Sequence, residues 1–244
     1  MKVVRPDATR MRRGGRPRPA RYLYRVTSGA PYQPSLFGAA VPSFDPAFSA
    51  AKRIHLDDEA WIDLVPGWVS GADPLFERLR SQMPWGQRSR WMYEQRVAEP
   101  RLTASFRLDS GRPLEPPILE QMRGALSTRY GVVFDSVGFN LYRDGRDSVA
   151  WHRDRIRKEV DRPIVPLVSL GEPRKLLFRP RCGGPSRAFP IGHGDLLVTG
   201  GSTQRTWEHA VLKVARAGAR ISIAFRHGAD LRPYATESLD RRRA

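Results

Sequence analysis

Apolar and polar residues alternate over several short segments in the second half of the chain. A period of two residues is typical of β-strands whose two faces lie in different environments. Turn sequences that contain glycine separate these segments, at residues 144–145, 171–173, 182–184 and 200–201. We therefore predict a run of short β-strands, at residues 137–141, 164–168, 176–178, 196–198 and 221–225.

Two helices are predicted before most of these strands. Residues 72–74 read Ala-Asp-Pro and lead into a leucine- and phenylalanine-containing stretch at 75–79, which is typical of a helix start. The second helix opens at Pro116-Pro117 and ends near Gly131. Helices followed by strands favour an α+β, mainly β fold. We expect a β-sandwich or jelly roll, with the helices flanking it on the N-terminal side.

The first fifty residues have a different composition. Residues 1–25 contain Lys2 and eight arginines against a single acid, and residues 30–50 are rich in Pro, Ala, Ser and Phe. We predict a disordered basic tail and linker at residues 1–52, a globular domain at 53–232, and a short basic tail at 233–244. The N-terminal arm is either a nonspecific phosphate-binding segment or a solvated tail without a role.

Residues 33–37, with the sequence Gln33-Pro34-Ser35-Leu36-Phe37, stand out within this linker. They resemble the short peptide by which bacterial DNA repair and replication proteins bind the sliding clamp. The alternative is that Leu36 and Phe37 anchor the linker on the domain. A sliding clamp is therefore one expected partner.

Basic residues exceed acidic ones, 42 to 25, for a formal net charge of +17. Such a balance indicates a polyanionic partner, with nucleic acid ahead of an anionic membrane surface. The single cysteine, Cys182, excludes an internal disulfide. The single cysteine, and a basic start that no apolar h-region follows, lead us to expect a cytoplasmic protein. No apolar run is long enough for a membrane span, so no membrane partner is expected, and we expect a monomer.

Two histidines and an aspartate form the candidate metal site. His152 and Asp154 are two residues apart, so their side chains would point to one face of a strand, and His209 would come from a distant strand. Two imidazoles and a carboxylate are the ligands of non-heme Fe(II) oxygenases. Zinc hydrolases also use three protein ligands. A second His-x-Asp pair, at residues 193–195, lies beside glycines and is better explained by a tight turn.

The segment 220–226 combines strand alternation with two arginines. One face is apolar, and the other carries Arg220, Ser222 and Arg226. Arginines on the inner face of a barrel need anions, because a buried unpaired guanidinium is costly. A dicarboxylate cosubstrate would pair with Arg220, and Arg226 would bridge that cosubstrate to Asp154. The alternative is an edge strand whose arginines lie in solvent.

In this order, the motifs resemble those of the AlkB family. They are Asn-x-Tyr-x-x-Gly at residues 140–145, His-x-Asp at 152–154, the distal His209, and the two arginines of 220–226. The resemblance extends from about residue 84 to residue 227. Members are Fe(II)- and 2-oxoglutarate-dependent dioxygenases that repair alkylated nucleic acid. The resemblance therefore implies a double-stranded β-helix with Fe(II), 2-oxoglutarate and O₂.

The resemblance also implies residue roles. It makes three residues the iron ligands: His152, Asp154 and His209. Arg226 would orient the catalytic site. The residues expected to bind 2-oxoglutarate, with Arg220 on its distal carboxylate, are Asn140, Tyr142, Arg220, Ser222 and Arg226. Ser222 stands where many members have Asn, and Ile156 stands where some carry an acid that contacts the target base.

Residues 85–93 and 100–103, which precede the His-x-Asp pair, mix aromatic side chains with arginines. They resemble the lid of duplex-acting members, which must flip a base out of the stack. We expect nucleic-acid contacts from Arg88 and Arg101, the latter on a phosphate, and a wedge at Met92 or Tyr93. Phe106 would sandwich the base against His152. The alternative is that tryptophans of these segments are core residues of an outer strand.

The predicted function is oxidative demethylation of N-alkylated bases in DNA, coupled to decarboxylation of 2-oxoglutarate and releasing formaldehyde and succinate. This is direct-reversal repair of alkylation damage. Two alternatives stay open. One is a dioxygenase that acts on RNA or protein, and the other is a non-catalytic, basic nucleic-acid-binding protein with a degenerate site.

Overall fold

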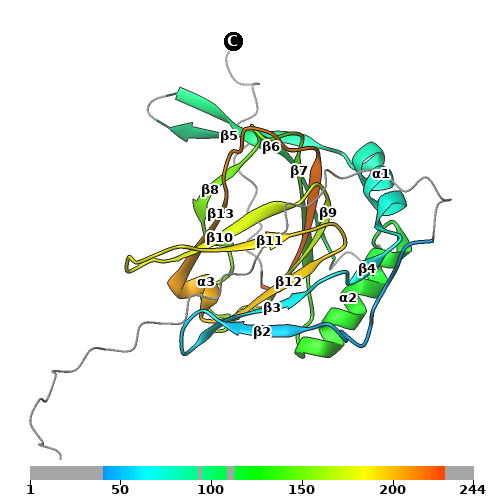
Figure 1. The fold of residues 1–244 in the computed structure, drawn as a ribbon, viewed down its shortest axis with the longest axis horizontal. Helices are drawn as coiled ribbons and strands as arrows, with labels where there is room; N and C mark the ends of the chain where they lie inside the picture. Colours follow the sequence, from blue (N-terminus) through cyan, green and yellow to red (C-terminus); the bar gives the residue numbers. More distant parts are fainter. Residues whose placement is uncertain (1–40, 93–94, 109–112, 229–244) are drawn as a thin grey trace, which may run out of the picture.

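The computed structural model describes residues 41–92, 95–108 and 113–228, which form three antiparallel sheets and three helices (Figure 1). The largest sheet has the strand order β2-β3-β12-β9-β14-β7-β6-β5, the second has the order β11-β10-β13-β8, and β1 pairs with β4. The bounds are β1 Ser43–Phe44, β2 Lys52–His55, β3 Ala60–Val65, β4 Val69–Ser70, α1 Ala72–Gln82, β5 Gly86–Met92, β6 Gln95–Arg107, α2 Pro117–Tyr130, β7 Ser136–Tyr142, β8 Val149–His152, β9 Val165–Gly171, β10 Arg174–Pro180, β11 Arg187–Ile191, β12 Leu196–Gly201, α3 Thr203–Thr206, β13 Trp207–Val211 and β14 Arg220–Arg226.

Two hydrophobic clusters fill the spaces between these layers. The first joins α1 and α2 to one face of the largest sheet, where Phe139, Ile223 and Phe225 are buried. The second lies between the two larger sheets and includes Phe178 and Leu197. Figure 1 shows both helices together on one side of the strands. The fold is therefore the predicted double-stranded β-helix with flanking helices.

Register between β7 and β14 sorts their side chains into two faces. The strands pair along their full length, with Asn140 opposite Ser222 and Phe139 opposite Ile223. Directly opposed residues of an antiparallel pair point to the same face. Phe139 and Ile223 face the helices, so Asn140 and Ser222 face the interior between the sheets. A run of polar side chains is thereby brought to one wall of that interior.

Both predicted helices are confirmed. Helix α1 buries Leu75, Phe76 and Leu79 against the sheet. Helix α2 ends at Gly131, whose φ of 67° lies in the left-handed region and whose N–H donates to the carbonyl of Ser127. This conformation favours glycine at the end of a helix. Among the described residues, no helix is long and apolar enough to cross a membrane.

The five predicted strands are all present, whereas several others carried no clear alternation. In β3 both faces are partly covered, and the polar Asp63 interrupts the pattern. Asp63 is 4% exposed, and it accepts hydrogen bonds from Arg53 at 2.7 and 2.8 Å and from Tyr130 at 3.1 Å. Strands β8 and β13 are short and contain His152 and His209. These strands lack a clear alternation of apolar and polar residues because Asp63, His152 and His209 lie within them.

The structured domain begins before residue 53, which corrects the predicted boundary of the N-terminal linker. Phe48 is 4% exposed and packs on Trp68, with ring centroids 5.5 Å apart. The backbone N–H of Asp45 donates to the Trp68 carbonyl, and the Trp68 indole N–H donates to the Asp45 carbonyl. The aromatic residues of this segment are core residues, although its Pro and Ala content is typical of a linker.

We expect Phe48→Ala to lower the free energy of unfolding by about 3–4 kcal/mol, because it removes a buried aromatic ring and leaves a cavity. Denaturant titration of the purified protein measures this change. Val41→Ala is the matched control, since Val41 is 85% exposed and should change stability by less than about 0.5 kcal/mol. Equal stabilities of the two variants would place residues 41–52 outside the folded unit.

Candidate metal and cosubstrate site

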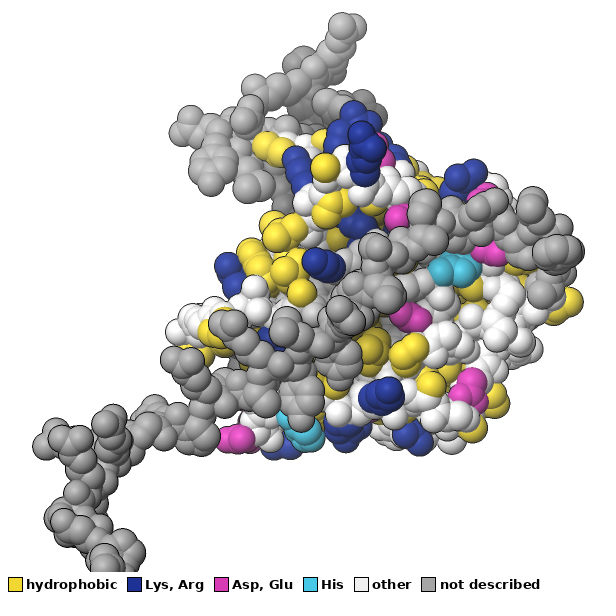
Figure 2. Space-filling view, viewed as in Figure 1, with side chains coloured by type: hydrophobic (Ala, Val, Ile, Leu, Met, Phe, Trp, Pro, Cys, Tyr) yellow, Lys and Arg dark blue, Asp and Glu magenta, His cyan; other side chains and the backbone are white. Residues whose placement is uncertain are grey.

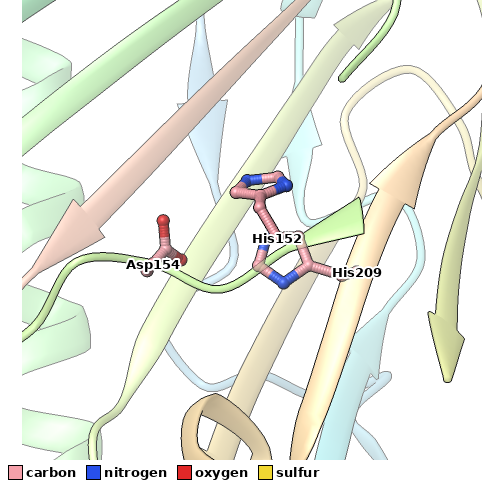
Figure 3. Close-up of side chains that lie close together, drawn as sticks. All are labelled: His152, Asp154 and His209. Carbon is pink, nitrogen blue, oxygen red and sulfur yellow. The ribbon is translucent and has the colours of Figure 1, made fainter. Parts of the chain in front are cut away.

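His152, Asp154 and His209 lie together beside β8 and β13 of the four-stranded sheet (Figure 3). His152 ends β8 and is directly opposite His209 of β13, with ring centroids 4.3 Å apart. One ligand atom from each of the three residues lies within 4.8 Å of the others. Asp154 is in the loop after β8 rather than on the strand, yet its side chain converges on the same point. Each of the three residues is only partly exposed.

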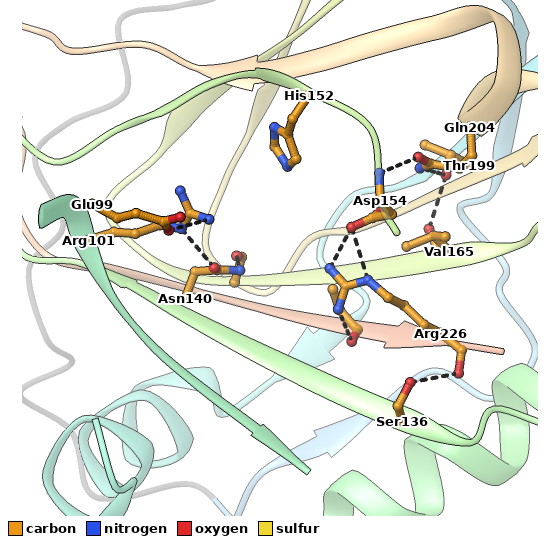
Figure 4. A network of polar contacts seen from close by, with 12 residues as sticks. Glu99, Arg101, Ser136, Asn140, His152, Asp154, Val165, Thr199, Gln204 and Arg226 are labelled. Atoms are coloured by element: carbon orange, nitrogen blue, oxygen red, sulfur yellow. Dashed lines mark hydrogen bonds and ion pairs between the residues drawn. The ribbon is translucent and has the colours of Figure 1, made fainter. Parts of the chain in front are cut away.

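Arg226 holds the Asp154 carboxylate in place (Figure 4). Its Nε and Nη2 donate to Asp154 Oδ1 at 3.0 and 2.7 Å. The backbone N–H of Asp154 donates to Gln204 Oε1 at 3.0 Å, and Gln204 Nε2 donates to Thr199 Oγ1 at 3.2 Å. Because both bonds from Arg226 go to one oxygen, the other carboxylate oxygen is left for a metal ion.

The electrostatics of the cluster favour metal-binding protonation states. Burial lowers the pKa of His209 to about 3, helped by the neighbouring His152. Burial also lowers the pKa of His152. For Asp154 burial alone would raise the pKa, but Arg226 and the two histidines together lower it to about 2. At neutral pH two neutral imidazoles thus face an ionised carboxylate, the forms that bind a metal cation.

Arg220 provides a second, cationic half of the site. It is 1% exposed and donates through Nε to Ser169 Oγ at 2.9 Å. Among the described residues, neither Nη1 nor Nη2 of Arg220 has a hydrogen-bond partner. Burial lowers its pKa to about 10, so the side chain is still charged at neutral pH. A charged guanidinium with two orphaned donors fits a carboxylate group, as 2-oxoglutarate would supply.

Three further residues line the wall beside Arg220. Asn140 Nδ2 donates to Ser222 Oγ at 3.2 Å. The Tyr142 ring lies 5.5 Å from the guanidinium carbon of Arg220. The structure therefore brings the five residues predicted to bind 2-oxoglutarate to one face of β7 and β14: Asn140, Tyr142, Arg220, Ser222 and Arg226. Their roles toward the cosubstrate stay predictions.

Arg101 is buried inside the site, which corrects the prediction that it contacts a phosphate at the surface. Its side chain is 11% exposed, with Nη2 3.2 Å from Glu99 Oε2. Its Nε donates to Asn140 Oδ1 at 3.0 Å. In Figure 4 this pair lies on the other side of His152 from Asp154. Arg101 is part of the inner site.

Phe106 lies on the helix side of the largest sheet, so the prediction that it stacks a base against His152 is wrong. It is opposite Val137 in the β6–β7 pair, and its ring contacts Phe139 with centroids 5.9 Å apart. Val137 and Phe139 belong to the core on the helix side of the sheet. Because Phe106 shares that face, it cannot sandwich a base against His152, which lies on the opposite side.

The remaining nucleic-acid predictions are only partly described. Arg88 of β5 is half-buried and donates to Ser105 Oγ at 3.3 Å. Met92 ends β5, in the hairpin that projects at the top of Figure 1, but its side chain is not described. Tyr93, the clamp-like residues 33–37 and the tails at 1–40 and 229–244 lie outside the described residues.

Several site residues escaped the sequence interpretation. Ser169 and Gln204 act through single hydrogen bonds to Arg220 and to the backbone of Asp154, and no spacing marks such partners. Glu99 is 6% exposed and lies beside Pro100, where pairing with β5 shifts register. Proline within a strand often marks such an irregularity, so it was a usable signal.

The rival pair at residues 193–195 is structural. His193 Nδ1 accepts a hydrogen bond from the Gly171 N–H at 2.7 Å. Asp195 accepts from the N–H groups of Gly192 and Gly67, at 2.7 and 2.8 Å. Gly194 has a φ of 79°, as a tight turn requires. In the described part of the chain, the only cluster that could hold a metal is His152, Asp154 and His209.

Comparison with known proteins agrees with this geometry. The family model of the 2OG-Fe(II) oxygenase superfamily matches residues 65–226. The chain is 33% identical over 184 residues to the alpha-ketoglutarate-dependent dioxygenase alkB homolog 3 of Bos taurus, covering 67% of this chain and 64% of that protein. It is 33% identical over 138 residues to the DNA oxidative demethylase ALKBH2 of Homo sapiens, covering 51% and 52%.

A solved structure, that of OsALKBH1, shares the fold with a TM-score of 0.51 and 14% identity, over 72% of this chain and all of that one. The chain spans slightly less than two thirds of the length of the alkB homolog 3 proteins that it matches. The family match covers the four-stranded sheet, the largest sheet from β12 to β5 without β2 and most of β3, the three-residue cluster, and the two arginines of β14. The chain belongs to the 2OG-Fe(II) oxygenase superfamily, as a member of its AlkB family of Fe(II)- and 2-oxoglutarate-dependent dioxygenases.

Proposed function

We propose that the protein is an oxidative demethylase of N-alkylated bases in DNA. The observation that carries this is Arg220, whose two terminal nitrogens are buried without partners on the wall that also holds Arg226, the ion-pair partner of Asp154. One half of the site fits a metal ion and the other half fits a dicarboxylate. Because both halves are intact, a degenerate, purely binding site is disfavoured.

The chain's own residues would divide the work as follows. His152, Asp154 and His209 would hold Fe(II) through two nitrogens and one oxygen. Arg220 would bind a carboxylate of 2-oxoglutarate with its free donors, while its Nε–H donates to Ser169 Oγ and holds the side chain in place. Arg226 keeps Asp154 ionised and oriented by donating twice to one of its oxygens. Fixed charges of this kind need no rearrangement during the reaction.

When bound, Fe(II), 2-oxoglutarate and O₂ would supply a two-electron oxidation of the substrate, in which 2-oxoglutarate loses CO₂, one oxygen atom of O₂ enters the succinate formed, and the other hydroxylates the N-methyl carbon. The resulting N-hydroxymethyl group then loses formaldehyde, and a proton remains on the base nitrogen. The protein confines this chemistry to an interior walled by the two sheets.

Nucleic acid is favoured as the substrate by charge. The net charge of +17 attracts a polyanion, and Figure 2 shows Lys and Arg side chains exposed at several separate places on the drawn face. The relative ALKBH2 is named a DNA oxidative demethylase. DNA is therefore the substrate we propose, and RNA and peptide are the competitors in the test.

Formaldehyde release should be measured with N-methylated single-stranded DNA, duplex DNA, RNA and a methylated peptide, each with Fe(II) and 2-oxoglutarate. We expect turnover on at least one DNA form to exceed that on the peptide by about 100-fold or more, a difference of about 2.7 kcal/mol in transition-state stabilisation. Turnover of RNA or peptide alone would contradict DNA as the substrate.

A further inference from the structure

The segment that carries Asp154 also places basic side chains at the edge of the site. Residues 153–158, called the basic loop, read Arg-Asp-Arg-Ile-Arg-Lys. The Asp154 side chain is 9% exposed and Ile156 is 7% exposed, so both point inward. The intervening and following residues are exposed: Arg153, Arg155, Arg157 and Lys158. Inward placement of Asp154 therefore turns Arg153 and Arg155 outward on either side of it.

Contacts with the rest of the domain hold the backbone of the basic loop. The Asp154 N–H donates to Gln204 Oε1 at 3.0 Å. The Arg157 N–H donates to the Gly228 carbonyl at 2.9 Å, and Arg205 Nη2 donates to the Arg157 carbonyl at 2.8 Å. Ile156 adds apolar burial between these points. A loop fixed in this way presents its charges with less ordering cost on binding than a flexible one.

The charge of the basic loop is strongly one-sided. It contains four basic residues and one carboxylate, and that carboxylate, Asp154, is paired with Arg226 at 2.7 Å. The next acidic residues, Glu159 and Asp161, follow the loop in the sequence. Arg162 Nε lies 3.8 Å from Asp161 Oδ2. Basic side chains are thus concentrated next to the metal cluster, where they can attract an anionic polymer.

Basic side chains approach the site from the β5–β6 hairpin as well. Arg88 donates to Ser105, and Ser105 is opposite Gly138 in the sheet. A Cβ built on Gly138 would lie 2.7 Å from Arg226 Nη1, so this face of the sheet is the one that Arg226 and Asp154 occupy. Arg88 is therefore bonded to the face of the sheet that lines the site, and it adds a cation to those of the basic loop.

We propose that the basic loop binds the phosphodiester backbone of the DNA strand that carries the target base, an inference that rests on the proposed function. Alternate residues of an extended chain are about 6–7 Å apart, a spacing comparable to that of neighbouring phosphates in an extended strand. Phosphates on Arg153 and Arg155 straddle Asp154, so the nucleotide between them faces the metal cluster. These residues take the phosphate role that the buried Arg101 does not fill.

The test uses the full chain and a labelled N-methylated single-stranded oligonucleotide. One variant carries Arg153→Gln, Arg155→Gln and Lys158→Gln. The matched control removes the same charge from exposed residues of other segments, with Lys175→Gln, Lys213→Gln and Arg216→Gln. Dissociation constants are measured for both variants and the wild type over a series of salt concentrations.

We expect the basic-loop variant to bind roughly tenfold or more weakly at low salt, and to lose about 2 units of the salt slope, at about 0.7 per phosphate contact on single strands. The control should keep most of the wild-type slope. Equal losses in the two variants would overturn the proposal, since the loop would then act only through net charge. Because binding is measured, this result is independent of turnover. A wild type without demethylase activity would refute the proposed function, whereas the proposal for the basic loop would still be tested by the difference in salt slope between the two variants.

Discussion

Replacing His209 with alanine is expected to abolish formaldehyde release, with a loss of about 10³-fold or more, equivalent to about 4 kcal/mol in the barrier. His209 is directly opposite His152 and is held neutral by burial, so it is a ready metal ligand. Alanine leaves one histidine and one carboxylate, too few to keep Fe(II) in place. Iron content per protein and the rate of formaldehyde release are the two measurements.

His55→Ala is the matched control for this loss. His55 is exposed on β2, in the strand at one edge of the largest sheet, and its replacement should change neither iron content nor activity. The free energy of unfolding of His209→Ala shows whether the domain is still folded. A folded His209→Ala protein that retains iron and wild-type turnover would refute the three-ligand site.

Arg220→Ala should raise the 2-oxoglutarate concentration needed for half-maximal turnover by about 30- to 1000-fold. Loss of a buried, charge-assisted contact costs about 2–4 kcal/mol, and each 1.4 kcal/mol is tenfold in binding. The two terminal nitrogens of Arg220 have no partner among the described residues, so the side chain is free to bind a carboxylate. Turnover of 2-oxoglutarate, followed as succinate, measures the effect.

Arg220→Lys separates charge from geometry at this position. A lysine keeps the positive charge but lacks the planar fork, so it should recover only part of the affinity for 2-oxoglutarate. Arg146→Ala is the control for loss of an arginine, because its side chain is 89% exposed. An unchanged 2-oxoglutarate requirement in Arg220→Ala would move the cosubstrate to another part of the site.

The strands with clear alternation and both helices could be predicted because their patterns reflect burial on one face. In β14 the apolar residues face the helices, and the polar ones, including Arg220, face the interior. The boundary at residue 53 could not be predicted in this way. Phe48 is buried by contacts with Trp68 and Tyr130, which are distant in the sequence.

The metal cluster was predictable from the order of motifs, whereas the nucleic-acid contacts were not. Arg101 and Phe106 are five residues apart on one strand, an odd separation that puts their side chains on opposite faces. They could not both face the substrate. The basic loop has no pattern of its own in the sequence, because its arginines and lysine are only four of the 42 basic residues of the chain.

The most direct test of the proposed chemistry is the ratio of formaldehyde to succinate when the wild-type protein is given an N-methylated single-stranded DNA, Fe(II), 2-oxoglutarate and O₂. One formaldehyde should be released for each succinate above the background measured without DNA, and the methylated base should be lost in the same amount. Succinate production that DNA does not stimulate, with no formaldehyde released, would contradict oxidative demethylation of DNA.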